Sequence, residues 1–197
     1  GKIYRPPSEA DSLILQATIG CSWNRCSYCA MYLDKRFKPR PLDELKEDMD
    51  LAASYLGAES VRRVFLADGD ALILRTARLL EILRELRARF PNFQRASVYA
   101  SPQSLLSKSV AELAELKSAG LPLHYMGPET GHDEVLKRIE KGVSAGEMVE
   151  GGRRVTDAGA KLSVNLLLGI AGTELSHEHA VASGRLVSEM DPQYVSA

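Results

Sequence analysis

The sequence predicts an α/β protein built as a partial (β/α)6 barrel of the TIM type, whose chain reaches about the sixth strand. Two observations support this fold class. Short apolar segments alternate with longer amphipathic ones, which indicates right-handed βαβ units and a parallel sheet. Polar residues follow the ends of several predicted strands, where such a barrel has its site. No Gly-x-Gly-x-x-Gly follows the first strand, so a dinucleotide-binding sheet has little support.

The strands are predicted from short apolar runs that end at glycine, proline or polar residues. Residues 1–12 are polar and contain Pro6-Pro7, so they are expected to form an irregular arm before a single domain over 13–197. The first strand ends at Gly20, and residues 193–197 are expected to form only the start of the sixth strand. The six expected strands cover residues 13–19, 61–67, 95–100, 121–126, 161–168 and 193–197.

The helices are predicted from apolar residues at helical spacing and from end signals. Pro41 suits the first position of a helix, and Gly120 suits a position just after one. The segment over 72–90 is rich in leucine and arginine and stops before Pro91. The expected helices cover residues 41–55, 72–90, 104–119, 132–139, 145–158 and 175–190.

Composition narrows the function class. The net charge of the 197 residues is −1, which is unlike a dedicated nucleic-acid binder. No apolar run reaches the roughly 18 residues of a membrane span, and the N-terminal residues lack a signal-peptide pattern. An odd number of clustered cysteines does not suit a disulfide framework, so a reducing cytoplasm is expected.

The three cysteines of the chain form one motif, Cys21-x4-Cys26-x2-Cys29, directly after the first predicted strand. Three thiolates can hold a [4Fe-4S] cluster and leave its fourth iron open, which is a catalytic arrangement. The alternative is a Cys3His zinc site completed by a distant histidine, such as His124 or His132.

This motif resembles that of the radical S-adenosylmethionine (SAM) superfamily. The common superfamily spacing is C-x3-C-x2-C, so the first interval here is one residue longer. An aromatic residue before the last cysteine belongs to the pattern, and Tyr28 supplies it. The order of the later motifs is closest to the subgroup that includes oxygen-independent coproporphyrinogen oxidase and elongator-type domains. The resemblance implies a [4Fe-4S] cluster on Cys21, Cys26 and Cys29, with SAM beside it.

The resemblance also implies residues for the methionyl end of SAM. Asp68-Gly69-Asp70 stands where the family has a Gly-Gly-Glu-like turn that holds the amino group, with Asp70 as its carboxylate. Gly127-Pro128-Glu129 resembles the family's Gly-x-Glu at the end of the fourth strand, and Glu129 is expected to contact SAM. Lys141, twelve residues later, takes the place of a basic residue that faces the SAM carboxylate.

Four further positions match the nucleoside end of SAM. Tyr99 and Ser101 occupy third-strand positions that usually face the ribose. Asn165 matches a polar residue for the ribose on the fifth strand, four residues before Gly169. Gly169 begins a turn that resembles the family's backbone contact with adenine.

The expected activity is reductive cleavage of SAM to a 5′-deoxyadenosyl radical, which abstracts hydrogen from a substrate that the sequence does not identify. An electron donor such as flavodoxin or ferredoxin is implied. The alternatives are methyl or aminocarboxypropyl transfer on the same scaffold, and a non-catalytic metal- or cluster-binding module.

Three further features have less specific interpretations. Lys35, Arg36, Lys38 and Arg40 form a basic run, which is either solvated surface or a contact for an anionic substrate, a tRNA or a reductase. His177 and His179 point about 200° apart on a helix and are expected at the surface. Trp23 packs over the cluster or over a partner.

Overall fold

The computed structural model describes residues 2–197 and shows one open, six-stranded parallel sheet with the strand order β1-β4-β5-β6-β7-β8. The predicted partial barrel is therefore confirmed. β1 pairs with β4 and β8 pairs with β7, so the sheet of the described chain ends at these two edges. The strands are β1 (Leu13–Gln16), β4 (Arg63–Ala67), β5 (Arg95–Tyr99), β6 (Leu123–Glu129), β7 (Lys161–Leu166) and β8 (Tyr194–Ser196).

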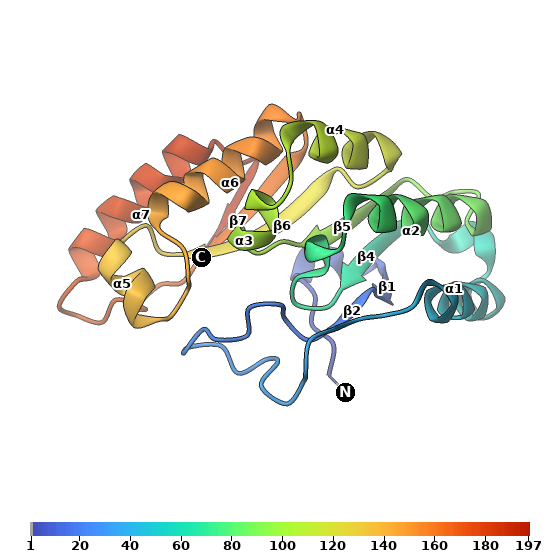
Figure 1. Ribbon diagram of the computed structural model, residues 1–197, viewed down its shortest axis with the longest axis horizontal. Helices are drawn as coiled ribbons and strands as arrows, with labels where there is room; N and C mark the ends of the chain where they lie inside the picture. The colour runs from blue at the N-terminus through green and yellow to red at the C-terminus, as the bar shows by residue number, and fades with distance from the viewer. Residues whose placement is uncertain (1) are drawn as a thin grey trace.

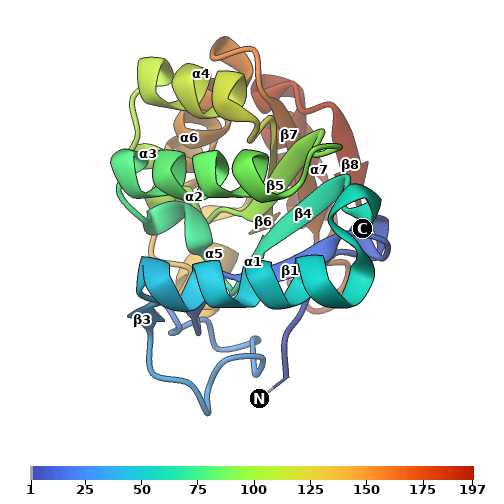
Figure 2. The same cartoon turned by 90° about the vertical axis from the view of Figure 1, so that its right-hand side faces the viewer.

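Helices cover one face of this sheet (Figures 1 and 2). Each helix of the layer contacts the next in chain order, as right-handed βαβ connections require. The layer consists of α1 (Leu42–Leu56), α2 (Thr76–Arg89), α4 (Val110–Ala119), α6 (Ala145–Asp157) and α7 (Ser176–Met190). Two shorter helices, α3 (Pro102–Leu106) and α5 (Asp133–Arg138), follow β5 and β6.

The two faces of the sheet carry different side chains because successive strand residues point to opposite sides. Val64, Leu66 and Val98 face the helices and belong to the main apolar core. On the other face, the rings of Phe65 and Tyr99 meet edge to face with centroids 5.0 Å apart, and Tyr125 packs against both. The face opposite the helices thus carries an aromatic cluster on β4, β5 and β6.

Two of the expected helices have wrong boundaries. The segment 72–90 begins as a 3-10 helix, η3 (Ala71–Ile73), and becomes helical only at Thr76, since Leu74 and Arg75 are extended. The segment 104–119 is two helices, because Ser109 and Glu112 form a capping box that starts α4. The first expected strand also divides. Its last residues form β2 (Thr18–Ile19), which pairs antiparallel with β3 (Lys38–Pro39).

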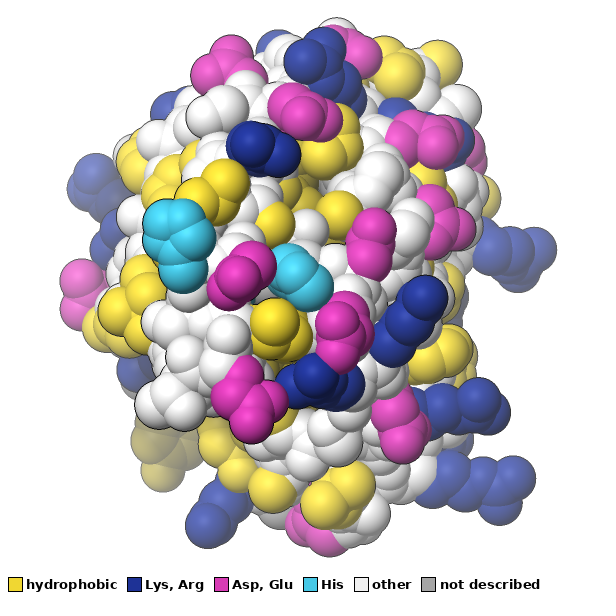
Figure 3. Space-filling model, turned by 90° about the vertical axis from the view of Figure 1, so that its left-hand side faces the viewer, with side chains coloured by type: hydrophobic (Ala, Val, Ile, Leu, Met, Phe, Trp, Pro, Cys, Tyr) yellow, Lys and Arg dark blue, Asp and Glu magenta, His cyan; other side chains and the backbone are white. Residues whose placement is uncertain are grey.

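The cysteine loop lies between β2 and β3 and hangs below the carboxyl ends of the strands (Figure 1). The short β2–β3 ladder closes the base of this loop, so its residues leave and rejoin the sheet at one place. The face seen in Figure 3 mixes acidic and basic side chains without a patch of one sign. None of the described helices is long and apolar enough to cross a membrane.

Candidate functional site

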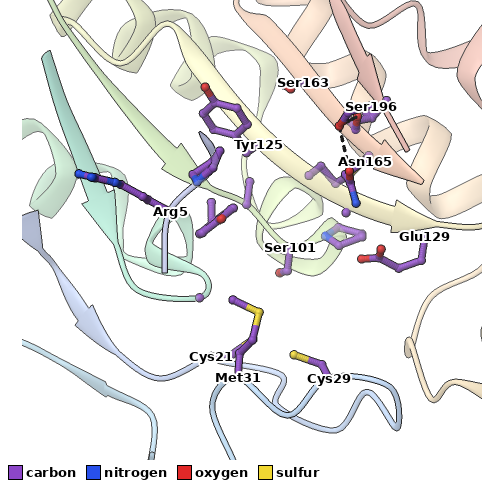
Figure 4. Close-up of a pocket in the computed structure, with 18 of the residues that line it drawn as sticks. Arg5, Cys21, Cys29, Met31, Ser101, Tyr125, Glu129, Ser163, Asn165 and Ser196 are labelled. Atoms are coloured by element: carbon purple, nitrogen blue, oxygen red, sulfur yellow. Dashed lines mark hydrogen bonds between the residues drawn. The ribbon is translucent and has the colours of Figure 1, made fainter. Parts of the chain in front are cut away.

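A cavity of about 950 Å³ opens between the cysteine loop and the concave face of the sheet. All three cysteines line it, together with residues from β5, β6, β7 and β8. Figure 4 shows Cys21 and Cys29 entering from the loop on one side, with Ser101, Glu129 and Asn165 on the opposite side. A cavity of this size suits a small organic ligand together with its cofactor.

The three cysteines are free thiols, each partly exposed. Burial raises the pKa of Cys21, and the neighbouring Asp70 and Cys29 raise it further. Burial also raises the pKa of Cys26, which Lys141 partly offsets. A metal centre bound here would hold these thiols as thiolates, because coordination deprotonates a cysteine ligand.

This donor set fits an iron–sulfur cluster in chemistry and in number. Among residues 2–197, no three His, Cys, Asp or Glu side chains are already converged on one point. Cluster binding therefore requires the loop to draw its three sulfurs together.

Glu129, Lys141 and Tyr28 form one hydrogen-bonded group at the edge of the cavity. Lys141 Nζ lies 3.0 Å from Glu129 Oε1, and both side chains are less than a tenth exposed. The Tyr28 hydroxyl donates to the same oxygen at 2.7 Å. Burial and the charge of Glu129 raise the pKa of Tyr28, so its phenol remains a donor. The predicted residues Glu129, Lys141 and Tyr28 are thus brought together beside the cysteines.

Asp70 is fully buried and does not line the cavity. Its carboxylate accepts from the Ser101 backbone N–H at 2.9 Å, from the Ser101 hydroxyl at 2.8 Å, and from Ser22 in the cysteine loop. The structure therefore shows Asp70 tying the loop to the end of β5. Ser101 itself lines the cavity and caps α3.

Asp68 is also fully buried, but one of its oxygens is open. Its Oδ2 accepts from Lys35 at 2.9 Å, and from Gln16 and the Gly20 backbone at 3.1 Å. Its Oδ1 has no hydrogen-bond partner within the described chain. The buried Tyr32 hydroxyl also has no hydrogen-bond partner among residues 2–197, and burial together with the neighbouring Asp68 raises the pKa of Tyr32. The phenol of Tyr32 is therefore a donor within the protein for this open oxygen, and Asp68, like Asp70, does not line the cavity.

Gly69 shows why this turn is tight. A Cβ at Gly69 would lie 2.6 Å from the Tyr32 ring and 2.9 Å from Cys21 Cβ. Only glycine lets the end of β4 approach the first cysteine so closely. Gly69 lines the cavity, whereas its neighbours Asp68 and Asp70 do not.

Of the four residues expected at the nucleoside end of SAM, three line the cavity and one does not. Tyr99, Ser101 and Asn165 line the same cavity as the cysteines. The Oδ1 of Asn165 accepts from the Ser196 hydroxyl at 2.8 Å, a contact drawn in Figure 4. Gly169 has a φ of +79° and closes a turn with Gly172, but it lies outside the cavity lining.

The N-terminal arm, which was expected to be irregular, forms one wall of the cavity. The sequence did not predict this role for the arm. Pro6, Pro7 and Ser8 line the cavity. Glu9, which is fully buried, accepts from Tyr125 at 2.7 Å and from Arg95 at 2.9 Å. An isolated acidic residue in a polar arm gives no local signal for such burial.

The positions of the four histidines bear on the zinc alternative and on the surface expectation. His124 faces the helices and His132 follows β6, and neither lines the cavity with the cysteines. The zinc alternative thus lacks its fourth ligand in this cavity. His177 is exposed as expected, but the surface expectation for His179 is wrong. His179 is 5% exposed and its Nδ1 lies 2.7 Å from Thr130 Oγ1, since α7 packs against the end of β6.

The basic run is not one solvated surface. Lys35 pairs with buried Asp68, and Arg40 pairs with Glu44 at 3.1 Å and with Asp48. Only Arg36 and Lys38 remain exposed without an ion pair in the described chain. Two of the four residues thus hold the loop against the barrel.

Comparison with protein families identifies the class of protein to which this chain belongs. The family model described as "Radical SAM superfamily" matches residues 15–182. The chain belongs to the radical SAM superfamily, whose members are enzymes that use a [4Fe-4S] cluster and SAM. No protein with a curated description matches the chain.

Solved structures share the fold. Coproporphyrinogen III oxidase (HemN) from Escherichia coli matches with a TM-score of 0.69 and 18% identity, over 94% of this chain and 43% of that one. Methylornithine synthase (PylB) matches with 0.66 and 18%, over 94% and 52%. The cobalamin-dependent enzyme OxsB, solved with aqua-cobalamin and SAM bound, matches with 0.64 and 19%, over 80% and 24%. The chain thus spans between about a quarter and a half of these relatives.

Proposed function

We propose that this chain carries the SAM-cleaving core of a radical SAM enzyme and that Cys21, Cys26 and Cys29 hold its cluster. The single observation that carries the proposal is that the three cysteines, all free, line one cavity with the carboxyl ends of the strands. When bound, the cluster and SAM supply reductive cleavage of a carbon–sulfur bond and hence a 5′-deoxyadenosyl radical for hydrogen abstraction.

The methionyl end of SAM is assigned to two charged sites. Lys141 is the cation for the carboxylate, because charge-assisted hydrogen bonds of this kind are strong and Lys141 lies beside Cys26. Glu129 holds Lys141 in place from the other side. For the ammonium group, the candidates are the carboxylates of Asp68 and Asp70, both fully buried and outside the cavity lining, so binding there requires the Asp68-Gly69-Asp70 turn to open toward the cavity. Asp68 has one oxygen without a hydrogen-bond partner in the described chain, whereas both oxygens of Asp70 accept hydrogen bonds.

The nucleoside end is assigned to the opposite side of the cavity. Ribose hydroxyls need donors and acceptors, which Ser101 and Asn165 provide. Tyr99 gives an apolar wall with a phenol whose pKa is raised by burial. Gly169 lies beyond the lining, so an adenine contact there requires the turn after β7 to move inward.

The walls of the cavity have a second task, which is to exclude water and stray C–H bonds from a reactive species. The aromatic side chains of Tyr99 and Tyr125 and the arm residues Pro6 and Pro7 line the cavity, and Phe65 packs behind the two tyrosine rings. An external one-electron donor such as flavodoxin or ferredoxin completes the proposed reaction.

The test is anaerobic reconstitution with iron and sulfide, reduction with dithionite, addition of SAM and chromatography of the products. The wild type is compared with Cys26→Ala and with Asp34→Ala, an exposed loop residue without an ion pair in the described chain. The proposal expects 5′-deoxyadenosine from the wild type and Asp34→Ala, and none from Cys26→Ala. Release of 5′-methylthioadenosine would instead indicate the transfer alternative. A complete cluster that yields neither product would overturn the proposal.

A further inference from the structure

Trp23, in the first interval of the cysteine motif, packs closely against a glycine that is remote in sequence. A Cβ placed on Gly142 would fall 2.1 Å from Cζ2 of the indole, which no side chain permits. Gly142 also has a φ of +76°, which favours glycine. The indole N–H donates to the Glu140 carbonyl at 2.8 Å. Trp23 therefore holds the backbone on both sides of Lys141.

The other residues of this interval are anchored as well. Ser22 donates to Asp70 at the end of β4. Asn24 has a φ of +45° and donates to the Tyr32 carbonyl at 2.9 Å. The Arg25 guanidinium lies 5.2 Å from the centre of the Trp23 ring. The four residues between Cys21 and Cys26 thus form a brace between β4, the cysteine loop and the segment that follows α5.

The segment around Lys141 also has supports besides Trp23, including the hydrogen bond from the Lys141 N–H to the Leu136 carbonyl at 3.0 Å. Ser27 N–H donates to the Ile139 carbonyl at 3.0 Å, and Gln103 donates to the Lys141 carbonyl at 2.9 Å. The Lys141 side chain reaches back to Glu129 at 3.0 Å and to the Tyr28 hydroxyl at 3.3 Å. Without the indole, the hydrogen bonds of Ser27 with Ile139 and of Tyr28 with the Lys141 side chain are what still joins this segment to the cysteine loop.

We infer that Trp23, seated on Gly142, is a positioning residue that fixes Lys141 relative to the cysteine loop and thereby sets the affinity for SAM. This inference rests on the proposed function for the role of Lys141. A cation that must be ordered when the ligand arrives binds more weakly than one already in place. Loss of the indole contact should therefore weaken SAM binding about tenfold or more, while the three thiolates remain.

The experiment uses Trp23→Ala, Trp23→Phe and Gly142→Ala, with Tyr55→Ala as the control. Tyr55 is an aromatic residue on α1 that is 91% exposed. Gly142→Ala keeps both Trp23 and Lys141 but displaces the indole. The melting temperature and the iron and sulfide content of each reconstituted variant establish that it is folded and loaded. The SAM dissociation constant is then measured by calorimetry. Amide hydrogen exchange is followed in the cluster-free proteins.

The inference expects faster exchange over residues 139–143 in Trp23→Ala and Gly142→Ala, and SAM dissociation constants raised about tenfold or more. The exchange rates and the SAM dissociation constant of Trp23→Phe should lie between those of these variants and the wild type, because phenylalanine supplies a smaller aromatic ring and no N–H. Unchanged amide exchange over residues 139–143 would refute the claim that Trp23 holds the segment around Lys141. Faster exchange with SAM affinity within twofold of the wild type would overturn the positioning role alone. A loaded wild type that does not bind SAM would overturn the proposed function and this role with it.

Discussion

The buried carboxylate of Glu9 is predicted to anchor the N-terminal arm under the barrel. Its side chain accepts hydrogen bonds from Ser12, Tyr125 and Arg95. Burial opposes its ionisation, but these three bonds outweigh burial and lower the pKa of Glu9. Burial in turn raises the pKa of Tyr125 to about 12, so its phenol remains a donor at neutral pH.

The expected loss in free energy of unfolding for Glu9→Ala follows from the Arg95 charge that the substitution leaves unpaired. Removing one partner of a buried ion pair costs about 3–5 kcal/mol. The Arg95 side chain is 24% exposed, so water can partly solvate the abandoned charge, and the lower end of that range applies. A loss of about 3 kcal/mol in a domain of this size lowers the melting temperature by roughly 6–12 °C.

The assay is urea and thermal unfolding of the cluster-free protein, with Glu47→Ala as the matched control. Glu47 is exposed on α1 and has no ion pair in the described chain. The variant Glu9→Gln tests the charge itself. A lowered folded-state pKa stabilises the protein above the unfolded value of about 4.5 and loses this effect as the pH falls through the folded value. The difference between wild type and Glu9→Gln should thus be constant from pH 7 to about 4.5 and shrink below it. A Glu9→Ala variant within about 0.5 kcal/mol of the wild type would refute the anchor.

Three further predictions concern the described core and can be checked by the same unfolding measurements. Burial lowers the pKa of His124 from 6.5 to about 4, so its protonation destabilises the fold as the pH falls through that interval. His124→Leu should remove this loss, about 3 kcal/mol at pH 4, and a variant with the wild-type pH profile would contradict it. Leu86→Ala, at a fully buried position of α2, should cost about 2–5 kcal/mol, and a cost below 1 kcal/mol would show that the site collapses around the cavity. Asp68→Ala should cost about 3 kcal/mol by leaving Lys35 unpaired, and Asp68→Ala with Lys35→Met should recover part of that loss; no recovery would mean that the ion pair is not the cause.

The position of the two aspartates after β4 changes how the site is interpreted. The resemblance gave the SAM ammonium to Asp70, but Ser101 and Ser22 already occupy its oxygens. Asp68 keeps one buried oxygen open. The two residues are neighbours of Gly69 and are chemically identical, so only the contacts from other elements distinguish the fully hydrogen-bonded carboxylate of Asp70 from that of Asp68, which has one oxygen without a partner in the described chain.

The sequence by itself determined the order of strands and helices and the class of site. The strands alternate with amphipathic helices, and this pattern is local, since hydrophobic periodicity depends on residues a few positions apart. The spacing of Cys21, Cys26 and Cys29 is also local, so the motif could be recognised without a fold. The exceptions within the local pattern arose where a cap or a turn interrupts a helix, as at Ser109.

Only the tertiary structure decided which charged and aromatic side chains serve the site. Trp23 meets Glu140 across 117 positions, and Glu9 meets Arg95 across 86. Periodicity predicts which face of an element is buried, but not which partner a buried polar group finds there. A buried charge in a polar arm and an indole seated on a glycine are stable only because distant elements complete their contacts, and those contacts form when the chain closes around the cavity.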